Sequence, residues 1–212
     1  EWIDKAEIAW GSAYLLGERI RPKLDLYKQR EIETFPGGVL FEAFAVRNQI
    51  EAYRKLVKGM GFPAIEISDG SIDLEHEEKC RIIESFSREF QVISEFGPRS
   101  NGKVIPLEDW PKHIQREIDA GASYVTLEGG GSGNVGIYAE QESTLAELVD
   151  TITGQIPPEK LIWETPQKAQ QIWFIQTLGS NVNLANIDPN DVIGLETMRL
   201  GLRADTLSSF LK

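Results

Sequence analysis

The sequence has few of the residues that build disulfide frameworks, cysteine-rich zinc sites or nucleic-acid-binding surfaces. Its 212 residues include a single cysteine, Cys80, which excludes an intramolecular disulfide and a site built from several cysteines. Basic residues number 22 against 33 acidic ones, so the net charge is −11, and no cluster of lysine and arginine stands out. Such a surface repels nucleic acid and anionic membranes, and we expect neither as a partner.

Long apolar runs are also missing. No segment approaches the roughly 18 apolar residues of a membrane span, and no signal-peptide pattern is present, so we expect a cytoplasmic protein with no membrane partner. A hydrophobic content of 41% is enough for a sizeable core. Within this composition Cys80 lies in the amphipathic stretch EEKCRIIESF, which is typical of a buried structural thiol.

The chain alternates between short apolar runs and longer segments with helical periodicity. The predicted strands are 3–10, 33–35, 64–67, 91–94, 124–127, 161–163 and 182–184. The predicted helices are 13–29, 40–60, 74–90, 106–120, 143–153, 166–178 and 188–201. The strands are nearly continuous in apolar character, as expected for strands covered on both faces.

Seven strand–helix units with a repeat near 30 residues favour a (β/α)₈ TIM-type barrel over residues 1–212, folded as a single domain. No dinucleotide-binding fingerprint follows the first strand, which counts against a doubly wound sheet. A barrel of this type needs eight units. Because the sequence begins at Glu1, inside a strand-like segment, we expect the first strand of the barrel to be missing from this chain. An open sheet of seven units is the alternative.

Acidic and amide side chains follow the predicted strands closely, where barrel enzymes place their chemistry. Three strands in succession end in glutamate, which is hard to attribute to chance. The residues concerned are Glu66 and Asp69 after one strand, Glu95, Glu128 and Glu164 after the next three, and Asn183 and Asn186 around the last, with Glu42 just inside a helix. Converging carboxylates repel one another unless a cation neutralises them, and Mg²⁺ binds through one or two carboxylates. Ion pairing or helix capping is the alternative for each single glutamate.

A glycine-rich loop, residues 129–136 with the sequence GGGSGNVG, follows one strand and could cradle an oxyanion through its N–H groups. Gly129, Ser132 and Gly133 are its candidate binding residues, although a simple connection fits equally well. Gly37 and Gly38 form a tight turn where the backbone would approach a ligand closely. Few cations accompany these groups: Lys168 and Arg99 are the candidates for holding an anion. His76 and His113 lie in polar helical stretches and are interpreted as solvated.

At this point the sequence resembles the phosphosulfolactate synthase family, which also includes a plant heat-stress-associated protein. The matching stretches are FPGGVLFE (35–42), GFPAIEISDGSIDL (61–74), AGASYVTLEGGGSGNVGIY (120–138), QKAQQIWFI (167–175) and 179–207. The resemblance implies a (β/α)₈ barrel lyase that adds sulfite to phosphoenolpyruvate with Mg²⁺, on the route to coenzyme M or related sulfonates. It then implies catalytic roles for Glu95, Glu128 and Lys168, and metal ligation by Glu66, Asp69 and Glu164. Barrels of this kind commonly associate, so we expect a homo-oligomer.

The sequence also departs from the family pattern, always at positions that are usually basic or polar. Glu7 stands where a lysine is usual, Pro98 replaces a basic residue, and Gly130 and Gly131 replace an arginine and a glutamate. Losing cations from a site for two anions costs binding, because each charged contact contributes about 1.5–3 kcal/mol. The alternative function is therefore a divergent family member, non-catalytic or repurposed. A third alternative is an unrelated barrel lyase or isomerase.

Overall fold

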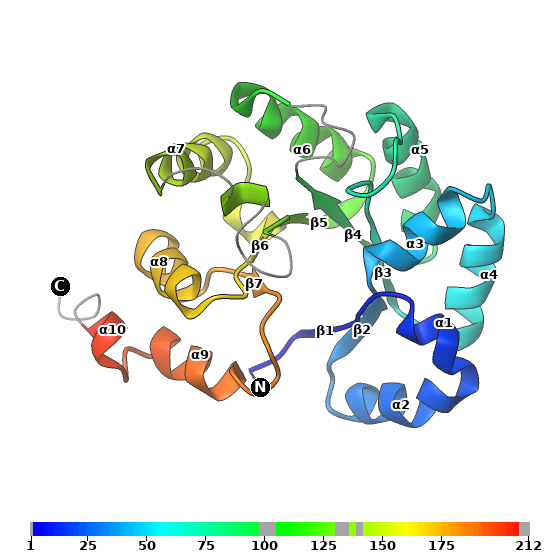
Figure 1. Cartoon of the computed structure of the whole chain (residues 1–212), viewed down its shortest axis with the longest axis horizontal. Coiled ribbons are helices and arrows are strands. Elements are labelled where there is room, and N and C mark those ends of the chain that lie inside the picture. Colours follow the sequence, from blue (N-terminus) through cyan, green and yellow to red (C-terminus); the bar gives the residue numbers. More distant parts are fainter. Residues whose placement is uncertain (1, 98–104, 130–135, 139–141, 208–212) are drawn as a thin grey trace. The chain divides into compact units, whose positions relative to one another are not determined.

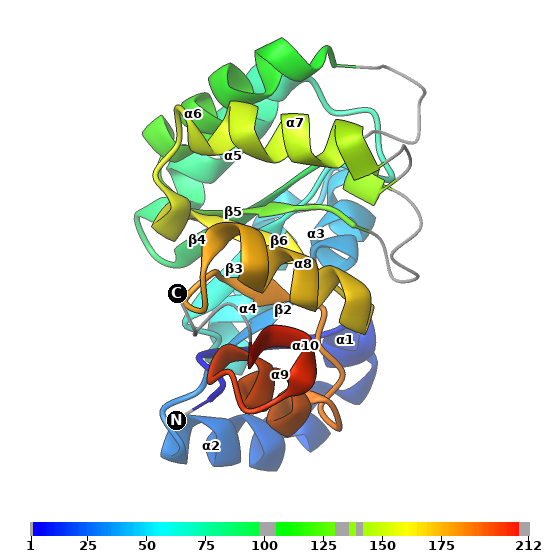
Figure 2. The same ribbon diagram turned by 90° about the vertical axis from the view of Figure 1, so that its left-hand side faces the viewer.

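The computed structural model describes residues 2–97, 105–129, 136–138 and 142–207 (Figures 1 and 2). The chain divides into two compact units, Ile3–Val125 and Thr126–Lys212. Each unit is described by itself below. Among the described residues, none of the helices combines the length and the apolar character that crossing a membrane requires.

The first unit is built from parallel strands separated by helices. Strand β1 (Lys5–Ile8) pairs in parallel with β2 (Glu33–Pro36), with Lys5 opposite Glu33. Strand β3 (Ala64–Ile67) pairs in parallel with β4 (Gln91–Phe96), and β5 (Ala122–Leu127) begins beside β4. The helical elements are α1 (Ser12–Leu16), η1 (Gly17–Ile20), α2 (Arg21–Gln29), α3 (Gly38–Ala45), α4 (Ile50–Met60), α5 (His76–Ser87), η2 (Leu107–Asp109) and α6 (Trp110–Asp119).

The second unit continues the same alternation. Strand β6 (Leu161–Glu164) pairs in parallel with the short β7 (Leu184–Ala185). The helical elements are η3 (Gly136–Tyr138), α7 (Glu142–Thr153), η4 (Pro158–Lys160), α8 (Lys168–Leu178), α9 (Val192–Arg199) and α10 (Ala204–Leu207). The last three helices pack on one another, as Figure 2 shows in orange and red.

Each unit has its own apolar core. In the first, the Tyr53 ring of α4 contacts Phe41 of α3 at 5.6 Å and Phe86 of α5 at 5.9 Å between centroids. All four residues of β3 are buried, as expected for a strand covered on both faces. In the second, Trp163 of β6 lies against Phe174 of α8 at 4.9 Å. A fully buried side chain of this kind stabilises the fold by about 1.5–3 kcal/mol.

The seven predicted strands are all present, with shifts of a few residues at their ends, and the α/β class with parallel strands is confirmed. Two predicted helices were wrong, because each is broken by a residue in the left-handed region. Gly17 (φ 51°) separates α1 from η1 and α2, and Asn48 (φ 55°) separates α3 from α4. Closure into an eight-stranded barrel, the missing first strand and the single-domain organisation stay predictions.

Candidate functional site

The carboxyl ends of β2, β3 and β4 gather acidic side chains in the first unit. Glu66 lies within β3, Asp69 follows that strand, and Glu95 lies within β4. Glu42 reaches the same place from the second turn of α3. Glu42, Glu66 and Asp69 are only 3%, 6% and 4% exposed, which is unusual for carboxylates and requires polar partners.

The turn between β2 and α3 supplies one of those partners. The Gly38 N–H at the start of α3 donates a hydrogen bond to Glu66 Oε2 at 2.7 Å. A β-carbon on Gly38 would overlap the Ser68 side chain, and one on Gly37 would overlap the Glu7 carboxylate. The close approach expected at these two glycines is therefore present, and it is made by protein side chains. Glu7, which lies near the carboxyl end of β1, thus has its carboxylate against this turn.

Ser68 stands between two of the acids and was not predicted from the sequence. Its Oγ lies 2.7 Å from Glu42 Oε1 and 3.2 Å from Glu95 Oε1, and the side chain is 2% exposed. The Ser71 N–H also donates to Glu42 Oε1, at 3.1 Å. A hydroxyl has one hydrogen, so it can donate to only one of the two carboxylates at a time.

Asp69 has a resident cation. Lys79 of α5, fully buried, places its Nζ 3.0 Å from Asp69 Oδ1, 2.9 Å from Glu117 Oε1 of α6 and 2.5 Å from the Glu95 carbonyl oxygen. Burial by itself would lower the pKa of Lys79, but the two carboxylates hold that pKa above its usual value. Sequence reasoning missed this lysine because it lies mid-helix in EEKC, where lysine is normally solvated.

The oxygen donors of this cluster suit a hard cation such as Mg²⁺, which prefers carboxylates and retains water or substrate oxygens. Glu42 and Glu66 fit best, because both are buried carboxylates beside the carboxyl ends of the strands. Asp69 fits less well, since Lys79 already offsets its charge. We name the set of Glu42, Glu66, Ser68 and Glu95 the acid cluster.

In the second unit the strand-end glutamate supports a loop. Glu164 Oε2 accepts a hydrogen bond from the Gly129 N–H at 2.8 Å, and the Tyr138 hydroxyl donates to the Glu164 carbonyl at 2.6 Å. A β-carbon on Gly129 would lie 2.6 Å from the Tyr138 ring and 2.9 Å from the Glu164 carbonyl oxygen. Glu164 thus fixes the start of the glycine-rich loop. Burial, with the nearby Glu164 charge, raises the pKa of Tyr138 above its usual value.

The other predicted residues of the second unit have local partners. Lys168 forms an ion pair with Asp205 of α10 at 2.7 Å, with both side chains partly exposed. The Asn183 amide donates to the Leu161 carbonyl oxygen at 3.0 Å, at the amino end of β6. Asn186 follows β7 and adopts a left-handed conformation (φ 59°). Glu128 ends β5, and its carbonyl oxygen accepts the Ile137 N–H at 2.9 Å.

Several predicted positions lie outside the described residues. They are Arg99 and Pro98, Ser132 and Gly133 of the glycine-rich loop, and the departures Gly130 and Gly131. The predicted roles of Arg99, Ser132 and Gly133 in holding anions stay predictions.

The interpretation of the two histidines as solvated was wrong. The His76 side chain is 13% exposed, and its ring lies 4.4 Å from the His113 ring between centroids. Burial opposes its charged form, but hydrogen bonds to Cys80 and Glu117 raise the pKa of His76 to about 9. The polar sequence around both residues concealed that α5 and α6 pack together.

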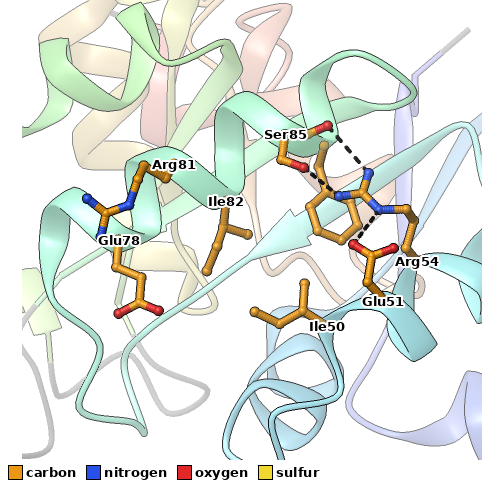
Figure 3. Close-up of a pocket in the computed structure, with 8 residues that line it drawn as sticks. Ile50, Glu51, Arg54, Glu78, Arg81, Ile82 and Ser85 are labelled. Carbon is orange, nitrogen blue, oxygen red and sulfur yellow. Dashed lines mark hydrogen bonds and ion pairs between the residues drawn. The ribbon is translucent and has the colours of Figure 1, made fainter.

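A surface groove lies between α4 and α5, lined by Ile50, Arg54, Arg81 and Ile82 among others (Figure 3). The guanidinium of Arg54 already has several partners in this groove. It forms an ion pair with Glu51, donates a hydrogen bond to Ser85 Oγ at 2.6 Å, and its central carbon lies 3.9 Å from the centroid of the Phe86 ring. The polar side chains that line the groove include Glu51, Arg54 and Ser85, which bond to one another.

Comparison with known proteins places this geometry in context. A sequence model of the family described as (2R)-phospho-3-sulfolactate synthase (ComA) matches residues 1–205. The chain is 37% identical to the phosphosulfolactate synthase of Methanothermobacter thermautotrophicus over 212 residues, 98% of this chain and 82% of the relative. The enzymes of the same name from Methanocaldococcus jannaschii and Bacillus subtilis are also 37% identical, covering 97% of this chain in each case and 84% and 82% of the relatives.

A solved structure, 3-hexulose-6-phosphate synthase, is similar in fold. The TM-score is 0.56 at 14% sequence identity, covering 94% of this chain and 87% of the other. At this identity the likeness concerns the fold alone, and it supports a TIM-barrel-like arrangement of strands and helices.

Proposed function

Because the chain belongs to the phosphosulfolactate synthase family, we propose that it catalyses the Mg²⁺-dependent addition of sulfite to phosphoenolpyruvate, giving phosphosulfolactate. We further propose that it works as a cytoplasmic homo-oligomer. The observation that supports the reaction best is the Ser68 hydroxyl shared between Glu42 and Glu95. Two carboxylates that share one hydroxyl lie close enough together for a cation to bind between them.

The proposed reaction forms one carbon–sulfur bond and one carbon–hydrogen bond. The sulfur lone pair of sulfite attacks the methylene carbon of phosphoenolpyruvate, and the π electrons of the double bond move toward the substrate carboxylate. A proton then adds to the carbon that bears the phosphate. Mg²⁺, when bound, would offset the negative charge that gathers on the substrate carboxylate.

The acid cluster divides this work between its members. Glu42 and Glu66 would hold the metal, because their carboxylates are buried at the strand ends. Glu95 would deliver the proton, because its carboxyl group lies near the carboxyl end of β4 beside Ser68 and Glu42. Lys79 would keep Asp69 in place through their ion pair. We therefore propose a structural role for Asp69, whereas the sequence suggested that it binds the metal.

The glycine-rich loop is the proposed anion site. The bond from the Gly129 N–H to Glu164 fixes where the loop begins, so we propose that Glu164 positions the loop and does not bind the metal. Backbone N–H groups of the loop, with Lys168, would then hold an anionic group of the substrate. Arg99 of the first unit stays a separate proposed anion-binding residue. Glu128, at the end of β5, stays a proposed catalytic residue.

A divergent member that binds without turnover is the second candidate. It is favoured by the position of Glu7, whose carboxylate lies against Gly37 at the carboxyl end of β1. An extra negative charge there disfavours anionic substrates. The two candidates differ in turnover.

An assay with phosphoenolpyruvate, sulfite and Mg²⁺ separates them, with the product detected by mass spectrometry. Synthase activity predicts a product whose formation requires all three components and stops when the metal is chelated. Saturable binding of phosphoenolpyruvate by calorimetry, with product at the rate without protein, would instead support the divergent member.

A further inference from the structure

The two histidines and the cysteine of this chain, the only ones among its 212 residues, meet at one place in the first unit. His76 and Cys80 are four residues apart on α5, and His113 and Glu117 are four residues apart on α6. Residues at this spacing lie on one face of a helix, one turn apart. The two helices pack together, so two pairs of metal-ligand types face each other.

The distances resemble those of a metal centre. His76 Nδ1 lies 3.2 Å from His113 Nδ1, and two nitrogens bound to one tetrahedral Zn²⁺ are about 3.3 Å apart. Cys80 Sγ lies 4.0 Å from His76 Nδ1 and 3.9 Å from Nε2, against roughly 3.5 Å between a nitrogen and a sulfur on the same ion, so metal binding requires the imidazole or the thiol to turn. A ligand atom of Glu77 falls within 4.8 Å of those of His76 and Cys80.

The opposite nitrogen of His76 has the partner that metal-bound histidines usually have. Its Nε2 lies 3.2 Å from Glu117 Oε1, and Glu117 is fully buried. Glu117 is itself held by the Ser94 hydroxyl, which donates to Oε2 at 2.6 Å, and by Lys79 at 2.9 Å. A carboxylate that accepts the far N–H of a histidine fixes the tautomer whose near nitrogen is free to bind a metal.

We propose that α5 and α6 form a binding site for Zn²⁺ or a similar transition-metal ion. His76, Glu77 and Cys80, whose ligand atoms lie within 4.8 Å of one another, are three of its ligands. His113 Nδ1, 3.2 Å from His76 Nδ1, takes the fourth position once its ring moves toward Cys80. Imidazole and thiolate prefer such ions to Mg²⁺, so this site differs in chemistry from the acid cluster. Glu117 orients His76 through a hydrogen bond, and the ammonium group of Lys79 offsets the negative charge of Glu117. Glu77 now pairs with Arg116 at 2.9 Å, on the surface, and would exchange that partner for the metal.

The alternative is a hydrogen bond between the two imidazoles, with Cys80 as a buried thiol. Cobalt substitution distinguishes the two, because Co²⁺ bound to a thiolate has a sulfur-to-metal charge-transfer band in the near ultraviolet, which a hydrogen-bonded histidine pair lacks. Zn²⁺ competition against the Co²⁺ signal then gives the affinity and the stoichiometry. Product formation is not measured, so failure here is distinct from failure of the proposed synthase activity.

The experiment uses the intact protein with Cys80→Ser, His113→Asn and, as a matched control, Glu78→Gln, an exposed acid on the same helix. We expect one Co²⁺ per chain and loss of the charge-transfer band in Cys80→Ser. Zn²⁺ binding should weaken at least about 100-fold in both Cys80→Ser and His113→Asn, which is more than the loss of a residue that only hydrogen-bonds to a ligand would cause. Glu78→Gln should bind like the unaltered protein. Circular dichroism checks that each variant is folded. No charge-transfer band in the unaltered protein, or Zn²⁺ affinity that both ligand variants retain, would overturn the proposal.

Discussion

The strand-end acids of the two units differ in what surrounds them. In the first unit, Glu42, Glu66 and Glu95 converge on one turn and one serine, with a buried lysine behind them. In the second, Glu164 holds the first N–H of a loop. Identical residue types after similar strands therefore do different work. Our proposal places the chemistry where several acids lie together and gives Glu164, which accepts a backbone N–H, a supporting role.

The lysine partners of the acids also differ between the units, because Lys79 is buried and Lys168 is partly exposed. Replacing Lys79 has the largest expected effect on stability. Lys79→Met leaves Asp69 and Glu117 as buried charges without their ammonium partner, and breaking a buried ion pair in this way costs about 3–5 kcal/mol. Urea unfolding followed by circular dichroism measures that loss.

Lys168→Met is the matched control, because Lys168 and its partner Asp205 are both partly exposed and solvent already screens the pair. Its unfolding midpoint should be unchanged. Equal unfolding midpoints for Lys79→Met and Lys168→Met would contradict the claim that the buried ion pairs of Lys79 stabilise the fold more than the surface pair of Lys168.

The activity of two variants, Glu95→Gln in the first unit and Glu164→Gln in the second, tests whether the two glutamates have different roles. Glu95→Gln removes the proposed proton donor and should lower kcat at least about 100-fold, as expected for general acid catalysis. Glu164→Gln keeps an oxygen that can accept the Gly129 N–H, so kcat should fall about tenfold or less. The opposite ranking, measured in the sulfite-addition assay, would move the catalytic centre to the second unit.

Much of the fold could be predicted from the sequence because buried parallel strands leave short, apolar runs. β3 was predicted to the residue for this reason. The breaks at Gly17 and Asn48 were missed because a single left-handed residue leaves no mark on periodicity.

The candidate site was only partly predictable. The acids were visible at the strand ends, but Ser68, Lys79 and the pairing of His76 with His113 depend on contacts between elements distant in sequence. Polarity suggested solvated side chains for the lysine and the histidines, and packing of α5 against α6 overrides that expectation. Sequence also could not reveal the ion pair between Lys79 and Asp69, and metal binding by Asp69 stays a prediction.

Glycines provide a smaller test of how tightly the acid cluster is built. Gly38→Ala places a β-carbon against Ser68 and should cost about 1–3 kcal/mol through overpacking, together with loss of activity. Unfolding in urea measures the first effect and the assay measures the second.

Gly59→Ala is its control, and it has the smallest expected effect. No atom lies within 4 Å of the added carbon, and the residue is within α4, so stability should rise by about 0.5–1 kcal/mol. A stability gain in both variants would mean that the turn after β2 is not under steric constraint.

The metal dependence of the reaction tests the acid cluster most directly. Initial rates of product formation are measured against Mg²⁺ concentration in the unaltered protein and in Glu66→Gln, with the other substrates saturating. If Glu66 helps hold the metal, the concentration of Mg²⁺ that gives half the maximal rate rises by at least about tenfold in the variant. An unchanged Mg²⁺ requirement in a folded Glu66→Gln protein would contradict metal binding at the acid cluster.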